Sequence, residues 1–546
     1  MLGHCSSLHL LSNTNALYCR AVSCLLRRLT ARAGQALQRG KPNSSPCAPL
    51  QGVGGQSRRG KVLWHQIFTV NQNGCKYYIC RNAIIMKKYF LSVLFIISVL
   101  KLSAQYKATW ESIDSRPVPA WFEDAKFGIF IHWGLYSVPA YSPTARDGVG
   151  VYQRYAEWYW HRWKEKSDIQ HFFTDFHNRV YGPDFKYQDF VRYFKAEMYD
   201  PSLWAEIFSR AGAKYVVLVS KHHEGFTLWP SGYSCNWNAM EVGPHRDLLG
   251  DLTKAVKEKG LKMGYYYSLL EWYHPLYKKE TIEQYVDQHM IPQMKELVTA
   301  YKPDILWTDG EWDYPSDVLK STEFLQWLFN ESPVKETIAI NDRWGKETRS
   351  KHGGYYTTEY DLVHDGNATG MKFERPWEEC RGMAGSFGYN RNEIAEDYSS
   401  SEELVQILVN KVARGGNLLL NIGPTADGRI PEIMQQRLLD IGNWLKVNGE
   451  AIYGTRKWDG APAVTPETTQ YFTRKGKDLY LIITRWQDKP IEVKGISKTG
   501  CVTMLGYEGK IKCNISGGRL LITPPTITPA TSPCNYAWVF KISNCL

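Results

Sequence analysis

Acidic residues are missing from the first 85 positions of this 546-residue chain. Residues 1–85 contain 11 lysines and arginines but no aspartate or glutamate, so they carry the whole net charge of +11. Residues 86–546 hold 55 basic and 55 acidic residues and are neutral, which argues against a nucleic-acid-binding protein. We interpret 1–85 as a leader that does not belong to the folded protein. It is either a region upstream of a true start at Met86, which we favour, or an Arg/Ser-rich transit peptide.

The apolar run at 89–100 is too short to cross a membrane. It has 12 residues, whereas a spanning helix needs about 20. Lys87 and Lys88 precede the run, and small residues ending at Ala104 follow it, as in a secretory signal peptide. We therefore predict a signal peptide at 86–104, a mature chain of 105–546, and no stable membrane anchor.

Cysteine is sparse in the predicted mature chain, which has six, and four of them fall in the last 46 residues. In a secreted protein such a cluster is compatible with one or two disulfides. Asn367 and Asn514 begin glycosylation sequons, which gain weight from the secretory context. The six cysteines are Cys235, Cys380, Cys501, Cys513, Cys534 and Cys545.

From about 121 to 455, short β-prone runs alternate with amphipathic segments such as 201–211 and 251–259. This alternation favours parallel strands joined by helices. The length suits an α/β fold of the (β/α)8 TIM-barrel type, and no G-x-G-x-x-G follows the first strand to indicate an open dinucleotide-binding sheet. The predicted strands are 127–133, 215–220, 262–268, 305–308, 337–341 and 417–422.

The pattern changes after the segment 432–447, which we predict as the last barrel helix. Short β-prone segments such as 477–486 and 519–523 are then separated by glycine, lysine and proline. We predict a catalytic barrel over 105–455 and a small antiparallel β-sandwich domain over 456–546.

Polar side chains stand where several predicted strands end. They are His132, the run His222-His223-Glu224, the pair Tyr267-Ser268, and Asp309. Active sites of (β/α)8 barrels gather at the carboxyl ends of the strands, so four such ends in one chain favour a catalytic site over packing.

Asp309 is the strongest candidate for a catalytic residue among these. It directly follows the apolar run ILWT, and Gly310 allows the chain to turn away. A lone strand-end aspartate is more often a helix cap or an ion-pair partner. The other polar strand ends shift the balance towards catalysis.

A glycoside hydrolase needs a second carboxyl group with a raised pKa. Glu378 is our candidate, because the ring of the adjacent Trp377 could shield its carboxyl from water. Glu379 is its nearest rival. The sequence pattern leaves three further competitors open, which are Glu157, Glu224 and Glu311.

The adjacent histidines His222 and His223 could suggest zinc. Neighbouring residues of a strand point to opposite faces, so the two cannot ligate one metal without a bend, and no H-E-x-x-H motif occurs. Hydrogen bonding to sugar hydroxyls is the better functional role, and a buried structural histidine is the alternative. Tryptophan and tyrosine number 20 and 34, which is common in carbohydrate-handling proteins as well as in aromatic-rich cores.

Residues from about 110 to 455 resemble the α-L-fucosidases of glycoside hydrolase family 29, most closely the animal lysosomal or secreted branch. The resemblance rests on long ordered motifs. They are KFGIFIHWG at 126–134, EWY at 157–159, AKY at 213–215, KHHEGF at 221–226, WTDGEW at 307–312, WEEC at 377–380, GGN at 415–417 and NIGP at 421–424.

This resemblance implies a retaining exo-α-L-fucosidase with a barrel, a β-sandwich and no cofactor or metal. The family nucleophile falls on Asp309 and the acid/base on Glu378. A covalent fucosyl-Asp309 intermediate is then expected. The resemblance places fucose-binding groups at His132, Glu157, Trp158, His222, His223 and Tyr267, with Trp377 against the apolar side of the sugar.

Two other functions remain open at this point. One is a non-catalytic, lectin-like fucose-binding protein, and the other is a retaining hydrolase for a related sugar such as galactose. The expected partners are fucosylated glycans and further copies of the chain, since relatives are commonly tetramers. The expected location is the secretory pathway, ending in the lysosome or outside the cell.

Overall fold

The structure is a computed structural model that describes residues 105–363, 366–367 and 374–546. The leader predicted at 1–85 and the signal peptide predicted at 86–104 therefore lie outside the described residues. Within the described ranges, no helix has the length and apolar character needed to cross a bilayer.

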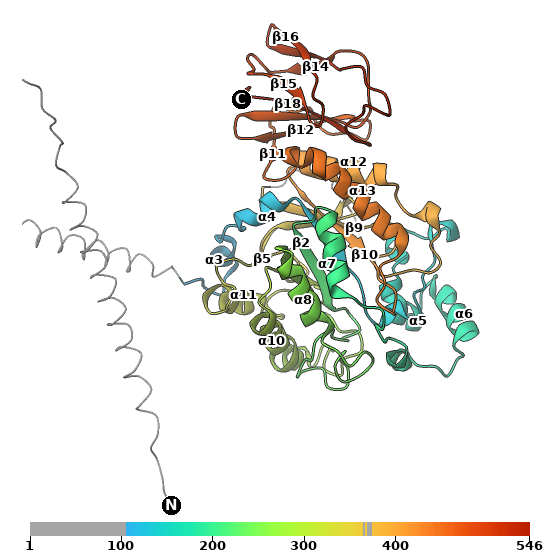
Figure 1. Cartoon of the computed structure of the whole chain (residues 1–546). Coiled ribbons are helices and arrows are strands. Elements are labelled where there is room, and N and C mark those ends of the chain that lie inside the picture. The colour runs from blue at the N-terminus through green and yellow to red at the C-terminus, as the bar shows by residue number, and fades with distance from the viewer. Residues whose placement is uncertain (1–104, 364–365, 368–373) are drawn as a thin grey trace, which may run out of the picture. The chain divides into compact units, whose positions relative to one another are not determined.

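Eight parallel strands form the first and larger part, and helices surround them (Figure 1). All six strands predicted for this part are present, with ends that differ by a few residues. Two were missed because they are short and carry charged residues: β6, with sequence YTTE, and β9, with sequence WEECRG. The eight strands are β1 (Phe127–Ile131), β2 (Tyr215–Lys221), β3 (Lys262–Ser268), β4 (Ile305–Asp309), β5 (Ala339–Ile340), β6 (Tyr356–Glu359), β9 (Trp377–Gly382) and β10 (Asn417–Ile422).

The strands follow one another around a barrel. The sheet order β5-β4-β3-β2-β1-β10-β9-β6 is the chain order read around a ring. Backbone hydrogen bonds complete the ring between β5 and the start of β6, where Tyr355 N donates to Ile340 O (3.0 Å) and Gly354 N to Asn341 O (3.0 Å). A hairpin, β7 (Leu362–Val363) and β8 (Gly366–Asn367), extends the sheet after β6. The predicted (β/α)8-like barrel is confirmed.

Helices cover the outside of the ring, although the β5–β6 and β6–β9 connections have none among the described residues. Helix α7 (Pro201–Arg210) begins at Asp200, whose side chain accepts hydrogen bonds from the amides of Ser202 and Leu203, and proline occupies its first position. The other α-helices are α3 (Trp110–Asp114), α4 (Ala120–Ala125), α5 (Tyr159–Lys164), α6 (Gln170–Val180), α8 (Leu248–Glu258), α9 (Ile282–Tyr285), α10 (Ile291–Tyr301), α11 (Ser321–Asn330), α12 (Ser401–Ala413) and α13 (Glu432–Asn448).

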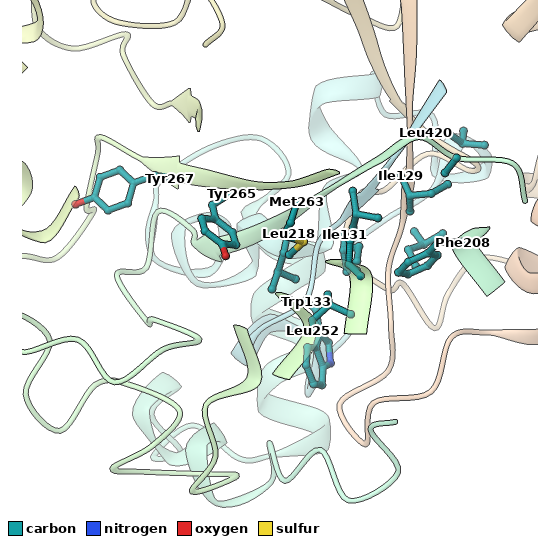
Figure 2. Packing of buried hydrophobic residues seen from close by; sticks show 14 of the residues in the cluster. Ile129, Ile131, Trp133, Phe208, Leu218, Leu252, Met263, Tyr265, Tyr267 and Leu420 are labelled. Carbon is teal, nitrogen blue, oxygen red and sulfur yellow. The ribbon is translucent and has the colours of Figure 1, made fainter. Parts of the chain in front are cut away.

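Side chains of the strands alternate between the barrel interior and the outer layer of helices, as period-2 geometry requires. In β3, Met263, Tyr265 and Tyr267 belong to the outer cluster, which Figure 2 shows with Ile129, Leu218 and Leu420. Tyr266 belongs to the inner cluster, together with Phe130 and Trp307. Which residues can reach a site inside the barrel mouth therefore depends on this alternation.

Gly128 of β1 makes room for a large ring in the barrel interior. A Cβ at this position would lie 2.3 Å from the ring of Tyr215, the paired residue of β2. Replacement of Gly128 by alanine is therefore expected to lower the free energy of unfolding by roughly 1–3 kcal/mol, since an overpacked core must shift. Thermal and urea denaturation would measure the loss.

Gly150 provides the matched control for this substitution. Its φ is −67°, and the nearest atom to an added Cβ would be 3.6 Å away, so alanine should fit there without loss. Equal stability of the Gly128 and Gly150 variants would contradict the packing argument.

The C-terminal part consists of two antiparallel sheets with apolar residues between them, such as Leu481, Phe540 and Leu520. Trp444 Nε1 of α13 donates a hydrogen bond to Ala537 O (2.8 Å) in this part. The predicted antiparallel sandwich is confirmed. Its strands are β11 (Arg456–Lys457), β12 (Gln470–Lys475), β13 (Asp478–Ile483), β15 (Val502–Met504) and β18 (Trp538–Ile542) in one sheet, and β14 (Ile491–Lys494), β16 (Lys512–Ser516) and β17 (Arg519–Thr523) in the other.

The six cysteines of the described residues are all free thiols. The disulfides that the C-terminal cluster suggested are therefore not formed in this structure. Cys545 is buried and Cys534 half-buried, whereas Cys501 and Cys513 are exposed.

Candidate active site

A cavity of about 210 Å³ opens at the carboxyl ends of the barrel strands. The residues around it come from the ends of β1, β3, β4, β6 and β9 and from the loops that follow these and neighbouring strands. Both charge signs and many aromatic rings take part in its wall. The lining residues are Phe130, His132, Tyr152, Tyr155, Glu157, Trp158, Arg162, His222, Tyr266, Trp307, Asp309, Trp312, Arg343, Arg349, Glu359, Cys380 and Phe387.

Asp309 ends β4 and presents its carboxylate to the cavity, as the sequence predicted for a strand-end residue. Arg343 Nη1 donates to its Oδ1 (2.6 Å), and the hydroxyl of Tyr266 donates to its Oδ2 (2.9 Å). Burial by itself would raise the pKa of Asp309. The positive charges of Arg343 and Arg349 outweigh burial and hold this pKa well below its usual value. Asp309 is therefore an ionised carboxylate fixed in one orientation.

Arg343 joins two carboxylates of the cavity wall. It lies on the β5–β6 connection and is buried, with its guanidinium 4.4 Å from the centre of the Trp307 ring. While Nη1 bonds Asp309, Nη2 lies 3.4 Å from Oε2 of Glu359. The two carboxyl groups that contact this guanidinium, those of Asp309 and Glu359, therefore lie close together in the cavity wall.

Glu359 is the last residue of β6 and lines the cavity. Its Oε1 accepts a hydrogen bond from the hydroxyl of Tyr155 (2.7 Å), another cavity residue. The register pairs Glu359 with Cys380 of β9, which also reaches the cavity wall. Glu359 and Asp309 thus line the same cavity and contact the same guanidinium.

Glu378 lies one layer deeper in the barrel and outside the set of described residues that line the cavity. It is two residues before Cys380 on β9, is fully buried, and accepts hydrogen bonds from the Tyr215 hydroxyl (2.5 Å) and from Trp307 Nε1 (3.0 Å). Burial raises the pKa of Glu378 to about 7, as the sequence argument expected. The structure thus places Glu378 outside the described cavity lining, away from where an acid would meet a ligand in the cavity.

The rival carboxyl groups have other surroundings. Glu379 accepts hydrogen bonds from the Thr358 hydroxyl (2.5 Å) and the Asp361 amide (3.0 Å), and Arg349 Nε binds Glu311 (2.5 Å). Glu157 does line the cavity and accepts from the Gly388 amide (2.8 Å), and burial raises its pKa to about 7.

Hydrogen bonds behind two of the predicted histidines set their tautomers. His132 Nδ1 lies 2.7 Å from Asn421 Oδ1, an acceptor because the amide nitrogen of Asn421 donates to Phe387 O. His223 Nδ1 lies 2.6 Å from the Ser268 hydroxyl, which itself donates to Leu270 O. Both Nδ1 atoms therefore carry the proton, and Nε2 is left as an acceptor for a ligand hydroxyl.

Burial keeps these rings neutral. It lowers the pKa of His132 to about 3 and that of His223 well below its usual value. His132 lines the cavity. His223 is not among the described residues that line it, but its Nε2 lies 3.8 Å from Asp309 Oδ2. His223 is therefore a neutral ring beside the Asp309 carboxylate, and His132 is a neutral ring of the cavity wall.

His222 lines the cavity, and Glu224 stands behind it. His222 Nδ1 faces Glu224 Oε2 at 3.6 Å, and neither atom has a hydrogen-bond partner among the described residues. Burial lowers the pKa of His222 to about 3 and raises that of Glu224 to about 8. Both are neutral near pH 6, so a protonated Glu224 can donate to Nδ1 and leave Nε2–H as a donor to the cavity.

Two predicted binding residues, Tyr267 and Trp377, lie outside the described cavity lining. Tyr267 belongs to the outer cluster in Figure 2, and its hydroxyl donates to Gln293 Oε1 (2.9 Å). Its neighbour Tyr266 points inward and binds Asp309 instead. Trp377 is at the amino-terminal start of β9, where the Arg414 guanidinium lies 5.0 Å from its ring centre, so it is at the opposite end of the strand from the cavity. Glu157, Trp158, His132 and His222 do line the cavity.

Sequence reasoning missed Tyr266, Arg343 and Glu359. Alternation along β3 from Ser268, which pairs with Asp309, could have found Tyr266, because residues two apart on a strand point to the same side. Glu359 ends a strand just as Asp309 does, but YTTE is too short and polar to be recognised as one. No sequence pattern indicated a functional role for Arg343, since it lies on a loop that carries no recognisable motif.

One group of side chains outside the cavity has metal-ligand chemistry. Glu271, His274 and His289 bring ligand atoms within 4.8 Å of one another. Lys221 Nζ (2.5 Å) and His289 Nε2 (2.7 Å) already bind Oε1 of Glu271. The buried ammonium would repel a metal cation, so this group is an ion-pair network. It holds the loop after β3 against the end of β2.

These features together define a class of protein. They are a carboxylate fixed as an anion, a second carboxyl group in the same cavity, and a polar cavity with aromatic walls. At the mouth of a (β/α)8 barrel, this set is that of a glycoside hydrolase. The geometry by itself leaves the sugar open.

Comparison with known sequences identifies the family. Residues 94–450 match the profile described as Alpha-L-fucosidase, and residues 464–543 match the Alpha-L-fucosidase C-terminal domain. The chain belongs to the α-L-fucosidase family. It is a glycoside hydrolase, an exo-acting α-L-fucosidase, so the family resemblance noted in the sequence is confirmed.

Relatives and solved structures agree over nearly their full length. The Alpha-L-fucosidase of Dictyostelium discoideum is 48% identical, covering 83% of this chain and 98% of its own. The Tissue alpha-L-fucosidase of Homo sapiens is 42% identical, covering 80% and 92%. The crystal structure of Thermotoga maritima alpha-fucosidase in complex with fucose has a TM-score of 0.66 at 37% identity, covering 80% of this chain and 100% of that one.

The pair of His222 and Glu224 gives a testable expectation. Glu224→Leu removes the carboxyl group that faces His222 Nδ1, so KM for an aryl fucoside should rise about tenfold as a buried donor–acceptor pair is lost. Glu224→Gln can still donate to Nδ1 and should stay within about threefold of wild type. Steady-state kinetics and thermal midpoints would test both. An equal rise in KM for the leucine and glutamine variants would show that Glu224 does not act by hydrogen bonding.

Proposed function

We propose that Asp309 is the nucleophile of a two-step retaining mechanism. Its carboxylate is ionised and held by Arg343 and Tyr266, with the second oxygen near His223. It attacks the anomeric carbon of fucose and forms a glycosyl ester while the bond to the departing oxygen breaks. The single observation that carries this proposal is the buried carboxylate at the end of β4, kept anionic within the cavity.

Glu359 takes the role of acid and base in this proposal, in place of Glu378. In the first step it gives its proton to the departing oxygen. Esterification of Asp309 removes its negative charge from Arg343, so the guanidinium can stabilise the charge that Glu359 gains when it gives up its proton. In the second step ionised Glu359 takes a proton from water, which attacks the ester and releases fucose.

Polar groups of the cavity wall, together with His223 beside Asp309, are proposed to bind the fucose hydroxyls. Nε2 of His132 and of His223 are acceptors, and Nε2 of His222 is a donor, with Glu157 as a further partner. A site with such fixed buried groups rejects sugars that lack a matching hydroxyl. Trp158 is proposed to contact the sugar as well. Phe130, Trp307 and Phe387 supply apolar surface for a ring that carries a methyl group in place of a 6-hydroxyl.

The anomer released first tests the mechanism. Proton NMR during hydrolysis of 4-nitrophenyl α-L-fucoside should show α-L-fucose first, with the β anomer growing only by mutarotation. Initial release of the β anomer would mean inversion and would exclude a glycosyl ester on Asp309. The corresponding α-galactoside serves as control and should be cleaved far more slowly.

A non-catalytic lectin-like protein would bind fucose without releasing 4-nitrophenol, so the same assay addresses it. The natural substrates in this proposal are fucosylated glycoproteins, glycolipids or oligosaccharides. Relatives include proteins named Tissue and Plasma alpha-L-fucosidase, which supports a route through the secretory pathway to the lysosome or the extracellular space. We also propose a catalytic domain at 105–455, a sandwich at 456–546, and assembly into a homo-oligomer.

A further inference from the structure

Trp312 belongs to the cavity wall and to the protein surface at once. It lines the cavity, yet 36% of the residue is exposed to solvent. The chain reaches it from Asp309 through a sharp turn at Gly310, whose φ is +77°. Trp312 is therefore at the mouth of the cavity, three residues from the proposed nucleophile.

Aromatic rings extend from Trp312 along one side of this mouth. Its ring centre lies 5.8 Å from that of Trp158, which lies 5.2 Å from Trp272, and Trp272 stacks on His161 at 4.9 Å. The Arg162 guanidinium lies 5.1 Å from the Trp158 ring centre and helps to hold it. We call Trp158, Trp272 and Trp312 the aromatic rim.

The size of the cavity places the rest of a substrate at this rim. Pockets for drug-sized ligands have about 300–1,000 Å³. A cavity of about 210 Å³ with charged groups inside suits a single sugar. When fucose occupies it, the unit to which fucose is linked must lie outside, where Trp312 offers exposed aromatic surface.

We propose that Trp312 is the platform of a second subsite, which binds the hexopyranose next to fucose by its apolar face. The proposal rests on the proposed function, because it concerns the leaving group of that reaction. Galactose and N-acetylglucosamine units are the chemical class that fits, since their rings present C–H groups on one face and hydroxyls at the edge. The face of an indole ring attracts such polarised C–H groups and excludes water from them.

Binding outside the reacting centre should raise the rate as well as the affinity. Contact energy with a remote part of the substrate can be used to hold the scissile bond in the cavity. A fluoride leaving group cannot use the rim, whereas a sugar leaving group can. The ratio of the two kcat/KM values therefore measures the second subsite separately from the fucose site.

Trp312→Ala is the variant that tests this, with two substrates. One is α-L-fucosyl fluoride, and the other is a disaccharide of L-fucose α-linked to galactose. We expect kcat/KM for the disaccharide to fall about tenfold or more, while kcat/KM for the fluoride stays within about threefold. Trp312→Tyr should restore most of the disaccharide activity, because a flat ring remains.

Tyr273→Ala is the matched control. Tyr273 is 44% exposed and packs on Trp160 with ring centres 4.2 Å apart, but it lies outside the described cavity lining. This variant should change neither substrate. If Trp312→Ala lowers both substrates equally, or neither, the subsite is refuted. Wild-type protein that hydrolyses neither substrate would instead overturn the proposed function, so the two failures are distinguishable.

Discussion

Replacement of Asp309 by asparagine is expected to reduce kcat for aryl α-L-fucosides by at least about 10³-fold. Asparagine has nearly the same shape and can keep a hydrogen bond to Arg343 or Tyr266, but it cannot form the glycosyl ester. KM should change much less than kcat, because the groups proposed to bind the hydroxyls remain. Steady-state kinetics and the inhibition constant of L-fucose would separate these two effects.

Glu311→Gln is the control for this variant. Glu311 is a buried carboxylate two residues from Asp309, and it pairs with Arg349, as Asp309 pairs with Arg343. It is outside the described cavity lining, so its loss should cost much less activity than the loss of Asp309. A 2-deoxy-2-fluoro fucoside should leave its sugar on Asp309, which peptide mass spectrometry can locate. A label on any other residue would contradict the nucleophile assignment.

Replacement of Glu359 by alanine is expected to lower kcat by about 10²–10⁴-fold for substrates with a sugar leaving group. The loss should be smaller for α-L-fucosyl fluoride, whose leaving group needs little proton donation. Azide ion needs no general base and fits the space left by the missing carboxyl group. It should therefore restore the turnover of the fluoride in this variant and yield a fucosyl azide.

Glu378→Gln decides between the sequence-based assignment and the structural one. Glutamine can still accept hydrogen bonds from Tyr215 or Trp307, although one of the two contacts weakens. We expect a lower thermal midpoint and a loss that is equal for fluoride and disaccharide. Azide rescue of a Glu378→Ala variant, without rescue of Glu359→Ala, would return the acid/base role to Glu378.

The barrel strands show how much of the fold could be predicted from the sequence. Runs such as FGIFI and YVVLVSK are apolar enough to be recognised as buried strands, and the polar residues after them had to fall at one end of the barrel. This reasoning placed Asp309, His132 and His222 correctly. It failed for β6 and β9, whose charged residues look like loop sequence because their partners, such as Tyr155 and Lys411, are far away along the chain.

Local sequence also could not choose between neighbours. Tyr266 and Tyr267 are both tyrosines on one strand. Only the way β3 sits in the closed sheet, with one of its faces towards the barrel interior, decides that Tyr266 faces the cavity and Tyr267 the helices. Glu359 is half-buried and Glu378 is buried, and both carboxyl groups belong to barrel strands. Only the register between β6 and β9, which pairs Glu359 with Cys380 and Thr357 with Glu378, decides which one reaches the mouth.

The amino-acid sequence thus determined the barrel, the sandwich, the family and the place of Asp309, our proposed nucleophile, at a strand end, because each depends on runs of residues that are continuous in the chain. The tertiary structure decided that Glu359 lines the same cavity as Asp309, that Arg343 contacts both carboxyl groups, and that the rings of the aromatic rim lie together. These depend on distances between segments that meet only when the ring of strands closes, and no local pattern records such distances.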